Sequence, residues 1–232
     1  MLEINLNLPS VYTNEKPLHL IQWVKDFASL CTWKDIENCM NNPDLWGLEL
    51  IDPKNRKLPY KGVDLSREKD FLFDRFNNGD HGLVITKFGH YNATTRNLLR
   101  FFEERFDVNA EIHVYCGLSS QSTSFKIHCD APTNFIIQVE GTCHWKIYEN
   151  RMSNLLDFEH SHPDHVYEED LTTVIDTVLN PGDGVLIPPR QYHVAIPTGR
   201  RISLSIPCWG RERGSRTRCD RNYYKFPSEI TS

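Results

Sequence analysis

The sequence lacks the features that mark a membrane protein, a secreted protein or a zinc ribbon. Its 232 residues contain no apolar run long enough to span a bilayer. The first residues, MLEINLNLPS, do not join a basic segment to an apolar one as signal peptides do. The seven cysteines include no Cys-x-x-Cys pair and are odd in number, which argues against a disulfide framework and favours a reducing compartment. These absences predict a cytoplasmic protein.

A strong excess of one charge is also missing. The net charge of -5 at pH 7 gives no general case for nucleic acid as a partner. The exception is the basic segment from Arg211 to Lys225, for which we expect a solvated C-terminal tail, with an anionic partner as the alternative. A hydrophobic content of 39% and a charged content of 25% are typical of a packed globular protein. We find no internal repeat and no low-complexity tract.

The chain divides into a mostly helical first part and a β-rich second part. Apolar residues at helical spacing predict helices over residues 17–30, 33–40, 68–76 and 94–106, and strands are expected over 48–51 and 82–88. Thr94 or Thr95 is expected to cap the last helix. We therefore predict a helical region (1–81) that packs on a barrel, a catalytic core (82–209) and a basic tail (210–232).

From Ala110 onward the pattern changes to short strands separated by turns. The expected strands cover residues 111–116, 124–129, 134–140, 143–149, 173–179, 184–188, 193–197 and 201–206. Turn residues such as Glu140-Gly141 and Asn180-Pro181-Gly182-Asp183 separate them. Short strands in this number predict a double-sheet jelly roll, so the fold class is mainly β with N-terminal helices and a double-stranded β-helix of the cupin type.

A candidate metal site lies at the ends of two of these strands. His128 and Asp130 are two residues apart, so on a strand they point to the same face, and His193 begins a later strand after Ile-Pro-Pro. Two histidines and one carboxylate are the ligand set that binds Fe(II) on one face and leaves positions open for a co-substrate and oxygen. His128, Asp130 and His193 are thus both metal ligands and catalytic residues in this interpretation.

Three stretches extend the motif: GLVITKFGHYNATTRNLLRFFEERF, IHVYCGLSSQSTSFKIHCDAPTNFIIQVEGTCHWKIY and LNPGDGVLIPPRQYHVAIPTGRRISLSIP. Together, over roughly residues 82–209, they resemble the Jumonji-C oxygenases, and among them the cupin-type ribosomal oxygenases and related hydroxylases. The resemblance implies Fe(II), 2-oxoglutarate and O2. It also implies hydroxylation of an unactivated C–H bond, in many members on a protein side chain, and demethylation is a related outcome. Relatives often dimerise, so a homodimer stays open.

The chain departs from this family at one position of the co-substrate site. The family pattern Gly-x-Lys-x-Trp places a Lys or Arg against the distal carboxylate of 2-oxoglutarate, and this chain has Cys143 there. A thiol with a pKa near 8.5 is mostly neutral at pH 7 and cannot replace that charge. Three other cations could meet the carboxylate. Arg201 in an Arg-x-Ser motif with Ser203 comes first, followed by Lys126 and Lys146.

Further co-substrate ligands follow from strand parity and the resemblance. Tyr115 lies where relatives place a tyrosine hydroxyl, and Asn134 lies on a strand face where relatives carry polar residues. The loop with His160, His162 and His165 is expected to be a polar loop near the active-site mouth, with a second metal site as the alternative.

Three functions remain open at this point. The first is the dioxygenase just described, acting on a protein or peptide side chain or on a free amino acid or small metabolite. The second is a metal-dependent cupin enzyme that does not use 2-oxoglutarate, which the substitution at Cys143 favours. The third is a non-catalytic cupin module that binds a ligand, which the complete triad of ligands disfavours.

Overall fold

The computed structural model describes residues 16–43, 45–54, 57–58, 65–153 and 166–210. Its strands are β1 (Leu18–Leu20), β2 (Gly47–Ile51), β3 (Lys57–Leu58), β4 (Gly82–Thr86), β5 (Val108–Ala110), β6 (His113–Gly117), β7 (Thr133–Glu140), β8 (Cys143–Arg151), β9 (Thr173–Leu179), β10 (Gly184–Ile187), β11 (Gln191–Pro197) and β12 (Arg201–Gly210). Its α-helices are α1 (Trp33–Asn41), α2 (Leu65–Asn77) and α3 (Ala93–Phe106). Short 3-10 helices cover Phe27–Ser29, Phe88–His90 and Glu168–Asp170.

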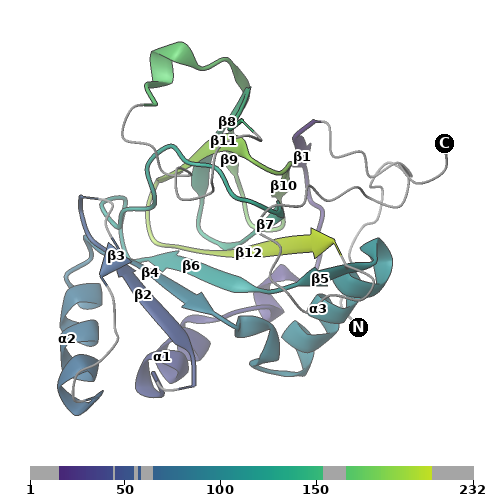
Figure 1. The fold of residues 1–232 in the computed structure, drawn as a ribbon. Coiled ribbons are helices and arrows are strands. Elements are labelled where there is room, and N and C mark those ends of the chain that lie inside the picture. Colours follow the sequence, from purple (N-terminus) through teal and green to yellow (C-terminus); the bar gives the residue numbers. More distant parts are fainter. Residues whose placement is uncertain (1–15, 44, 55–56, 59–64, 154–165, 211–232) are drawn as a thin grey trace.

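Two sheets face each other and form the barrel. The large sheet has the order β1-β10-β7-β12-β6-β4-β2-β3, with β5 added beside β12, and the small sheet has the order β11-β8-β9. Figure 1 shows the small sheet on one side of the large one and the three α-helices on the other side. The eight-strand prediction from residue 110 onward is confirmed except at residues 124–129, where only an isolated bridge between His128 and His193 forms. The double-stranded β-helix is thereby confirmed as the fold.

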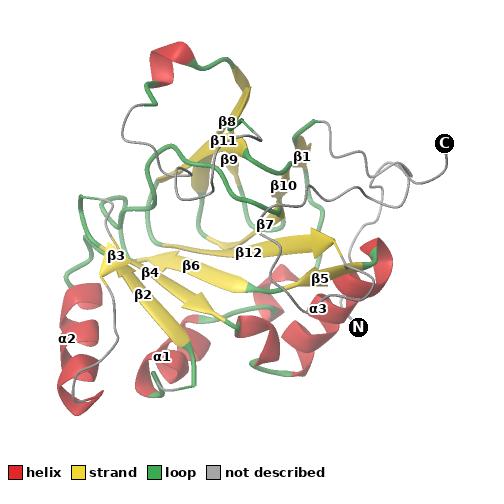
Figure 2. Cartoon of the chain, in the orientation of Figure 1, coloured by secondary structure: helices red, strands yellow, loops and turns green. Residues whose placement is uncertain are grey.

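Two of the apolar clusters in the described residues hold the layers together. The larger core joins the helices to the outer face of the large sheet, as where Leu98 and Phe102 of α3 pack with residues such as Leu204. The smaller core lies between the sheets and includes Ile136, Trp145 and Val185. The large sheet is covered on both faces, which is why β12 is buried from Arg201 to Cys208 without the alternation of a half-exposed strand. Figure 2 shows the same three layers by element type.

The turn between β9 and β10 follows directly from its sequence. Pro181 and Gly182 stand at the two central positions, Gly182 has φ of +91°, and the Asp183 N–H donates to the Asn180 carbonyl over 2.9 Å. A turn with proline first and a residue of positive φ second strongly favours glycine at the second place. The turn thus aligns β10 with β7, and Ile187 pairs with Asn134 at the cavity.

The helix expected over residues 17–30 is wrong. Leu18 and Leu20 instead pair with β10, and Gln22 has φ of +47°, which ends the strand. The Gln22 backbone N–H then donates to the Asp183 carboxylate over 2.8 Å. Pairing with a distant strand therefore overrides a local helical spacing, because propensity is a weak force beside tertiary contacts. The other three helices are confirmed.

Two details of the first part are also corrected. Asn92, not Thr94 or Thr95, caps α3, and its side chain accepts from the Thr95 N–H over 3.0 Å. Residues 1–81 contribute strands β1, β2 and β3 to the large sheet as well as helices, while the division at residues 82 and 210 stays a prediction. None of the helices in the described ranges is long and apolar enough to cross a bilayer. The six cysteines in these ranges are free and buried.

Candidate active site

The structure brings His128, Asp130 and His193 together at one end of the space between the sheets. One ligand atom from each lies within 4.8 Å of the others, and the His193 Nε2 atom is 3.5 Å from Asp130 Oδ2. His128 and His193 also exchange two backbone hydrogen bonds, of 3.1 and 2.8 Å. Residues that exchange both bonds face each other directly in an antiparallel pair, and their side chains project from the same face. Their ring centroids are therefore only 4.3 Å apart.

Backbone carbonyls hold both imidazoles in the orientation that a metal ligand needs. The His128 Nδ1 atom is 2.8 Å from the Lys126 carbonyl, and the His193 Nδ1 atom is 2.9 Å from the Gln191 carbonyl. A carbonyl only accepts, so each Nδ1 carries the proton and each Nε2 lone pair is left for a cation. Such partners on the second nitrogen are the usual support of metal-bound histidines. The two histidines therefore fit a metal ion.

The carboxylate of Asp130 is oriented by a chain of two side chains. The Asn134 amide donates to Asp130 Oδ2 over 3.0 Å, and the Ser205 hydroxyl donates to the Asn134 Oδ1 atom over 2.8 Å. The backbone of Asp130 is held as well, because its carbonyl accepts from the Arg190 N–H over 2.7 Å. Asn134 is thus brought to the site, but its amide meets the candidate metal ligand Asp130 rather than standing free for a co-substrate.

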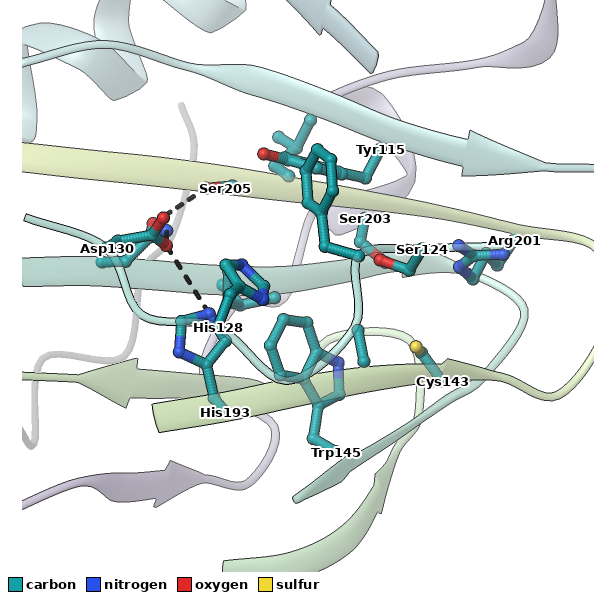
Figure 3. Close-up of a pocket in the computed structure, with 15 residues that line it drawn as sticks. Tyr115, Ser124, His128, Asp130, Cys143, Trp145, His193, Arg201, Ser203 and Ser205 are labelled. Carbon is teal, nitrogen blue, oxygen red and sulfur yellow. Dashed lines mark hydrogen bonds and ion pairs between the residues drawn. The ribbon is translucent and has the colours of Figure 1, made fainter. Parts of the chain in front are cut away.

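A cavity extends from the triad between the two sheets. Its lining comprises Tyr115, Ser124, Phe125, His128, Asp130, Asn134, Ile136, Cys143, Trp145, His193, Ala195, Arg201, Ser203, Leu204 and Ser205. Figure 3 shows the triad at one end and Arg201 with Cys143 at the other, and Trp145 lies between them. The cavity therefore connects β11, which carries the candidate metal ligand His193, with the start of β12.

Arg201 is a buried cation at the end of the cavity away from the triad. Only 3% of the residue is exposed, and its Nη1 atom donates to the Ser122 carbonyl over 3.1 Å. Its cross-strand neighbour is Gly117, where an added Cβ would come within 2.9 Å of that Nη1 atom, so glycine leaves the room for the guanidinium. Burial lowers the pKa of Arg201, but a guanidinium with an ordinary pKa above 12 stays charged.

No carboxylate pairs with Arg201 within the described part of the chain, and its titratable neighbours are thiols. The Cys143 thiol lies within hydrogen-bonding reach of the guanidinium, and Cys116 is also close. Burial raises the pKa of the Cys143 thiol, although Arg201 opposes this effect, so the thiol is neutral at pH 7. A buried charge without a counter-charge lowers the free energy of unfolding by roughly several kcal/mol, and an anionic ligand would remove that cost.

Ser203 lines the cavity, but its hydroxyl proton already forms a hydrogen bond within the protein. The Ser203 hydroxyl donates to Gln138 Oε1 over 2.8 Å. The orientation of that amide is set by its Nε2 atom, which donates to the Glu140 carbonyl over 2.8 Å. Ser203 therefore offers the cavity oxygen lone pairs rather than a donor.

The remaining expected residues fall in different places. Tyr115 lines the cavity, and burial followed by the charge of Asp130 raises its pKa, so the hydroxyl keeps its proton as a donor. Lys126 is exposed and does not line the cavity. Lys146 points away, as its strand parity predicts, and forms an ion pair with Glu168 at 2.7 Å. The three histidines expected near the mouth (residues 160–165) and the basic tail lie outside the described residues.

Several lining residues, among them Ser124, Phe125 and Trp145, are not predicted by the sequence patterns. The sequence patterns miss Ser124 and Phe125 because they predict a regular strand over residues 124–129. In the structure, the Phe125 ring stands edge-on to the His128 ring, with centroids 5.4 Å apart. Trp145 stacks on His193 with ring centroids 6.0 Å apart. Its parity with Cys143, two residues away on β8, was the available signal.

Comparison with known proteins identifies the family. Residues 90–212, more than half of the chain, match the family described as JmjC domain. The chain belongs to the JmjC domain family. This confirms the resemblance seen in the three sequence stretches.

Curated relatives share only part of their length with this JmjC chain. Ribosomal oxygenase 1 of Danio rerio is 27% identical over 166 residues, which cover 70% of this chain and 28% of the relative. The Escherichia coli ribosomal protein uL16 3-hydroxylase is 25% identical over 135 residues, covering 58% and 35%. The Aedes aegypti protein named bifunctional lysine-specific demethylase and histidyl-hydroxylase NO66 is 33% identical over 95 residues, covering 38% and 15%. The chain thus spans about a third or less of these relatives.

Solved structures agree on the fold. The Escherichia coli ribosomal oxygenase YcfD in complex with cobalt and 2-oxoglutarate superposes with a TM-score of 0.68 at 17% identity, covering 93% of this chain and 54% of that chain. A second YcfD structure gives a TM-score of 0.67. At this identity the likeness supports the shared JmjC barrel and leaves the chemistry to the residues of this chain.

Proposed function

We propose that this protein is an Fe(II)- and 2-oxoglutarate-dependent dioxygenase that hydroxylates an unactivated C–H bond of an amino-acid side chain in a protein or peptide. The observation that carries the proposal is a single cavity with a set of three potential metal ligands at one end and, at the other, a buried guanidinium that meets no carboxylate among the described residues. A dicarboxylate that chelates a metal with one end needs a cation for its other end. Arg201 is placed to meet that need.

The residues present suit Fe(II) at the triad. His128 and His193 offer neutral nitrogen lone pairs and Asp130 offers one carboxylate, which leaves a bound Fe(II) with a net positive charge for an anionic chelator. Fe(II) with 2-oxoglutarate and O2 supplies the oxidising chemistry, in which 2-oxoglutarate becomes succinate and CO2 and one oxygen atom enters the substrate C–H bond. The chain itself orients the ligands through backbone carbonyls and Asn134, and it excludes water by burying both histidines.

The substitution of the family's lysine is compensated within this cavity. Cys143 and Arg201 lie within hydrogen-bonding reach, although they come from different sheets. The positive charge that relatives carry on β8 is therefore carried here by β12, close to the same point. This arrangement supports 2-oxoglutarate as the co-substrate against a cupin enzyme that does without it.

The proposed substrate class rests on the relatives. Two of the relatives compared above are named as hydroxylases, one of a ribosomal protein and one of a histidyl residue, and the second is also named as a lysine-specific demethylase. These names support a side chain in a protein as the substrate. A free amino acid or small metabolite is the alternative. Parallel incubation with purified ribosomal proteins and with free amino acids, followed by mass spectrometry for one added oxygen atom, separates the two.

A charge-relocation experiment tests the co-substrate. Binding of 2-oxoglutarate to the Mn(II)-loaded protein is measured by calorimetry, and succinate release is measured with Fe(II) and O2. We expect Arg201→Met to weaken binding by about 100-fold, because a bidentate charge-assisted contact is lost. The double variant Arg201→Met with Cys143→Lys should recover part of it. Arg200→Met, on the exposed neighbour that lies over Trp33, is the matched control and should change nothing.

Two outcomes would contradict different parts of the proposal. Undiminished binding in Arg201→Met would contradict Arg201 as the anchor while leaving the enzyme class intact. No binding of 2-oxoglutarate and no succinate from the unmodified protein, although it binds metal, would contradict the proposed co-substrate. The second result would favour a metal-dependent cupin enzyme of another kind.

A cytoplasmic location and a homodimer stay predictions. Size-exclusion chromatography with light scattering tests the homodimer.

A further inference from the structure

The indole nitrogen of Trp145 is a buried hydrogen-bond donor without an acceptor. Only 6% of Trp145 is exposed, the residue lines the cavity, and its Nε1 atom meets no partner among the described residues. A buried N–H without a partner is unfavourable, by roughly 1–3 kcal/mol, and calls for an explanation. A ligand in the cavity that accepts hydrogen bonds would provide one.

The position of Trp145 in the cavity indicates which ligand group it can reach. Trp145 and Cys143 share the inward face of β8 and are two residues apart, a separation of about 7 Å along a strand. Cys143 lies within hydrogen-bonding reach of Arg201, whereas the Trp145 ring stacks on His193. Figure 3 shows the indole nitrogen on the side of the ring that is turned toward Cys143 and Arg201 rather than toward Asp130.

Ser203 cannot supply the donor that its motif leads one to expect. Its hydroxyl proton goes to Gln138, whose amide is locked by the turn carbonyl of Glu140. A carboxylate is an acceptor only, so it needs N–H or O–H groups that are still available. On the opposite sheet, Trp145 lines the cavity with an N–H that meets no acceptor among the described residues.

We propose that the Trp145 indole N–H is a hydrogen-bond donor, beside Arg201, to the distal carboxylate of 2-oxoglutarate. The inference rests on the proposed function. It makes Trp145 a co-substrate-binding residue, clamping the carboxylate from β8 while Arg201 holds it from β12. The stacking of the same ring on His193 joins the co-substrate clamp to the metal end.

A matched control exists elsewhere in the chain. The Trp23 indole nitrogen is also buried without a partner, but Trp23 belongs to the core between helices and large sheet and does not line the cavity. Trp23→Phe therefore removes an equally orphaned donor outside the proposed site. Trp145→Phe removes the donor and keeps a ring that can stack on His193.

The test measures 2-oxoglutarate affinity by calorimetry on the Mn(II)-loaded protein, together with Mn(II) affinity alone. We expect Trp145→Phe to weaken 2-oxoglutarate binding by about 10- to 100-fold, as the loss of a hydrogen bond to a charged group does. Mn(II) affinity should stay within about 2-fold, and Trp23→Phe should leave both affinities within the same limit. Equal 2-oxoglutarate affinity in Trp145→Phe and the unmodified protein would overturn the inference.

A second measurement does not depend on the folding of Trp145→Phe. In the unmodified protein loaded with Zn(II) and labelled with ¹⁵N-tryptophan, the five indole N–H signals are recorded before and after adding 2-oxoglutarate. We expect the Trp145 signal to shift downfield and the Trp23 signal to stay, the latter being assigned from Trp23→Phe. If 2-oxoglutarate binds and no indole signal shifts, the inference is wrong. If 2-oxoglutarate does not bind at all, the proposed function fails instead.

Discussion

The two ends of the cavity are built in opposite ways. At the metal end, His128, Asp130 and His193 each have a protein hydrogen-bond partner that sets their orientation. At the other end, the Arg201 charge lacks a carboxylate and the Trp145 N–H lacks an acceptor within the described chain. In the proposed function, the first end needs only a metal ion, and the second end needs an anion to meet its donors.

This difference shows where the chain gives up stability for function. Orienting the three triad residues costs little folding free energy, because backbone carbonyls and the Asn134 amide form hydrogen bonds with their polar atoms. Burying a donor that has no acceptor costs more folding free energy, because the donor loses its hydrogen bond to water and gains none from the protein. The carboxylate end is therefore expected to lower the stability of the protein without ligand and to regain it on binding. The following predictions test that contrast, from the largest effect to the smallest.

Removing a metal ligand should have the largest effect. We expect His193→Ala to lower Fe(II)-dependent succinate release by about 1,000-fold or more and to abolish stoichiometric Mn(II) binding in calorimetry, because one of three ligands is lost. His90→Ala, on an exposed histidine, is the control. Metal binding that survives His193→Ala unchanged would remove the basis for the metal end.

Removing the hydrogen bond that orients Asp130 should have a smaller effect on metal binding. Asn134→Ala takes away the donor to Asp130 Oδ2, and we expect Mn(II) affinity to fall by about 10- to 100-fold. Asn109→Ala, on the exposed asparagine of β5, should leave Mn(II) affinity unchanged. If Asn134→Ala binds Mn(II) normally but loses 2-oxoglutarate, Asn134 belongs to the co-substrate site, as the sequence pattern indicates.

Arg201→Met should reveal the cost of the unpaired charge. Without ligand, we expect the free energy of unfolding to stay the same or to rise by about 1 kcal/mol, because an apolar side chain replaces a buried guanidinium. Urea denaturation with and without 2-oxoglutarate measures this, and the ligand should stabilise the unmodified protein alone. A loss of several kcal/mol would show that Arg201 is a structural residue and that the two ends are alike.

The smallest effect is expected from the thiol beside Arg201. Burial raises the pKa of Cys143, so its thiolate forms only at a pH above its ordinary range, and below that pH it cannot repel the carboxylate. From about pH 6.5 to 8, Cys143→Ser should match the 2-oxoglutarate affinity of the unmodified protein within about 2-fold. Calorimetry across this range measures it. Affinity that falls with rising pH only when Cys143 is present would place a thiolate in the site.

Sequence spacing was a good guide where one strand decides the outcome. Arg201, Ser203 and Ser205 alternate along β12 and all line the cavity, and Lys146, of opposite parity to Cys143 on β8, points outward. Most strand positions followed as well, because short apolar runs and turn residues are local signals. The sequence predictions failed where pairing with a residue far along the chain determines the structure, as at Leu18, which pairs with β10.

The sequence by itself determined the candidate metal ligands, the barrel and the missing charge at Cys143, since each is a matter of residue type and local spacing. Only the tertiary structure decided how the polar side chains are used. Asn134 supports Asp130, Ser203 gives its proton to Gln138, and Trp145 keeps its donor for the cavity. The reason is that a hydrogen bond needs a partner within about 3 Å, and these partners come from strands far apart in the chain.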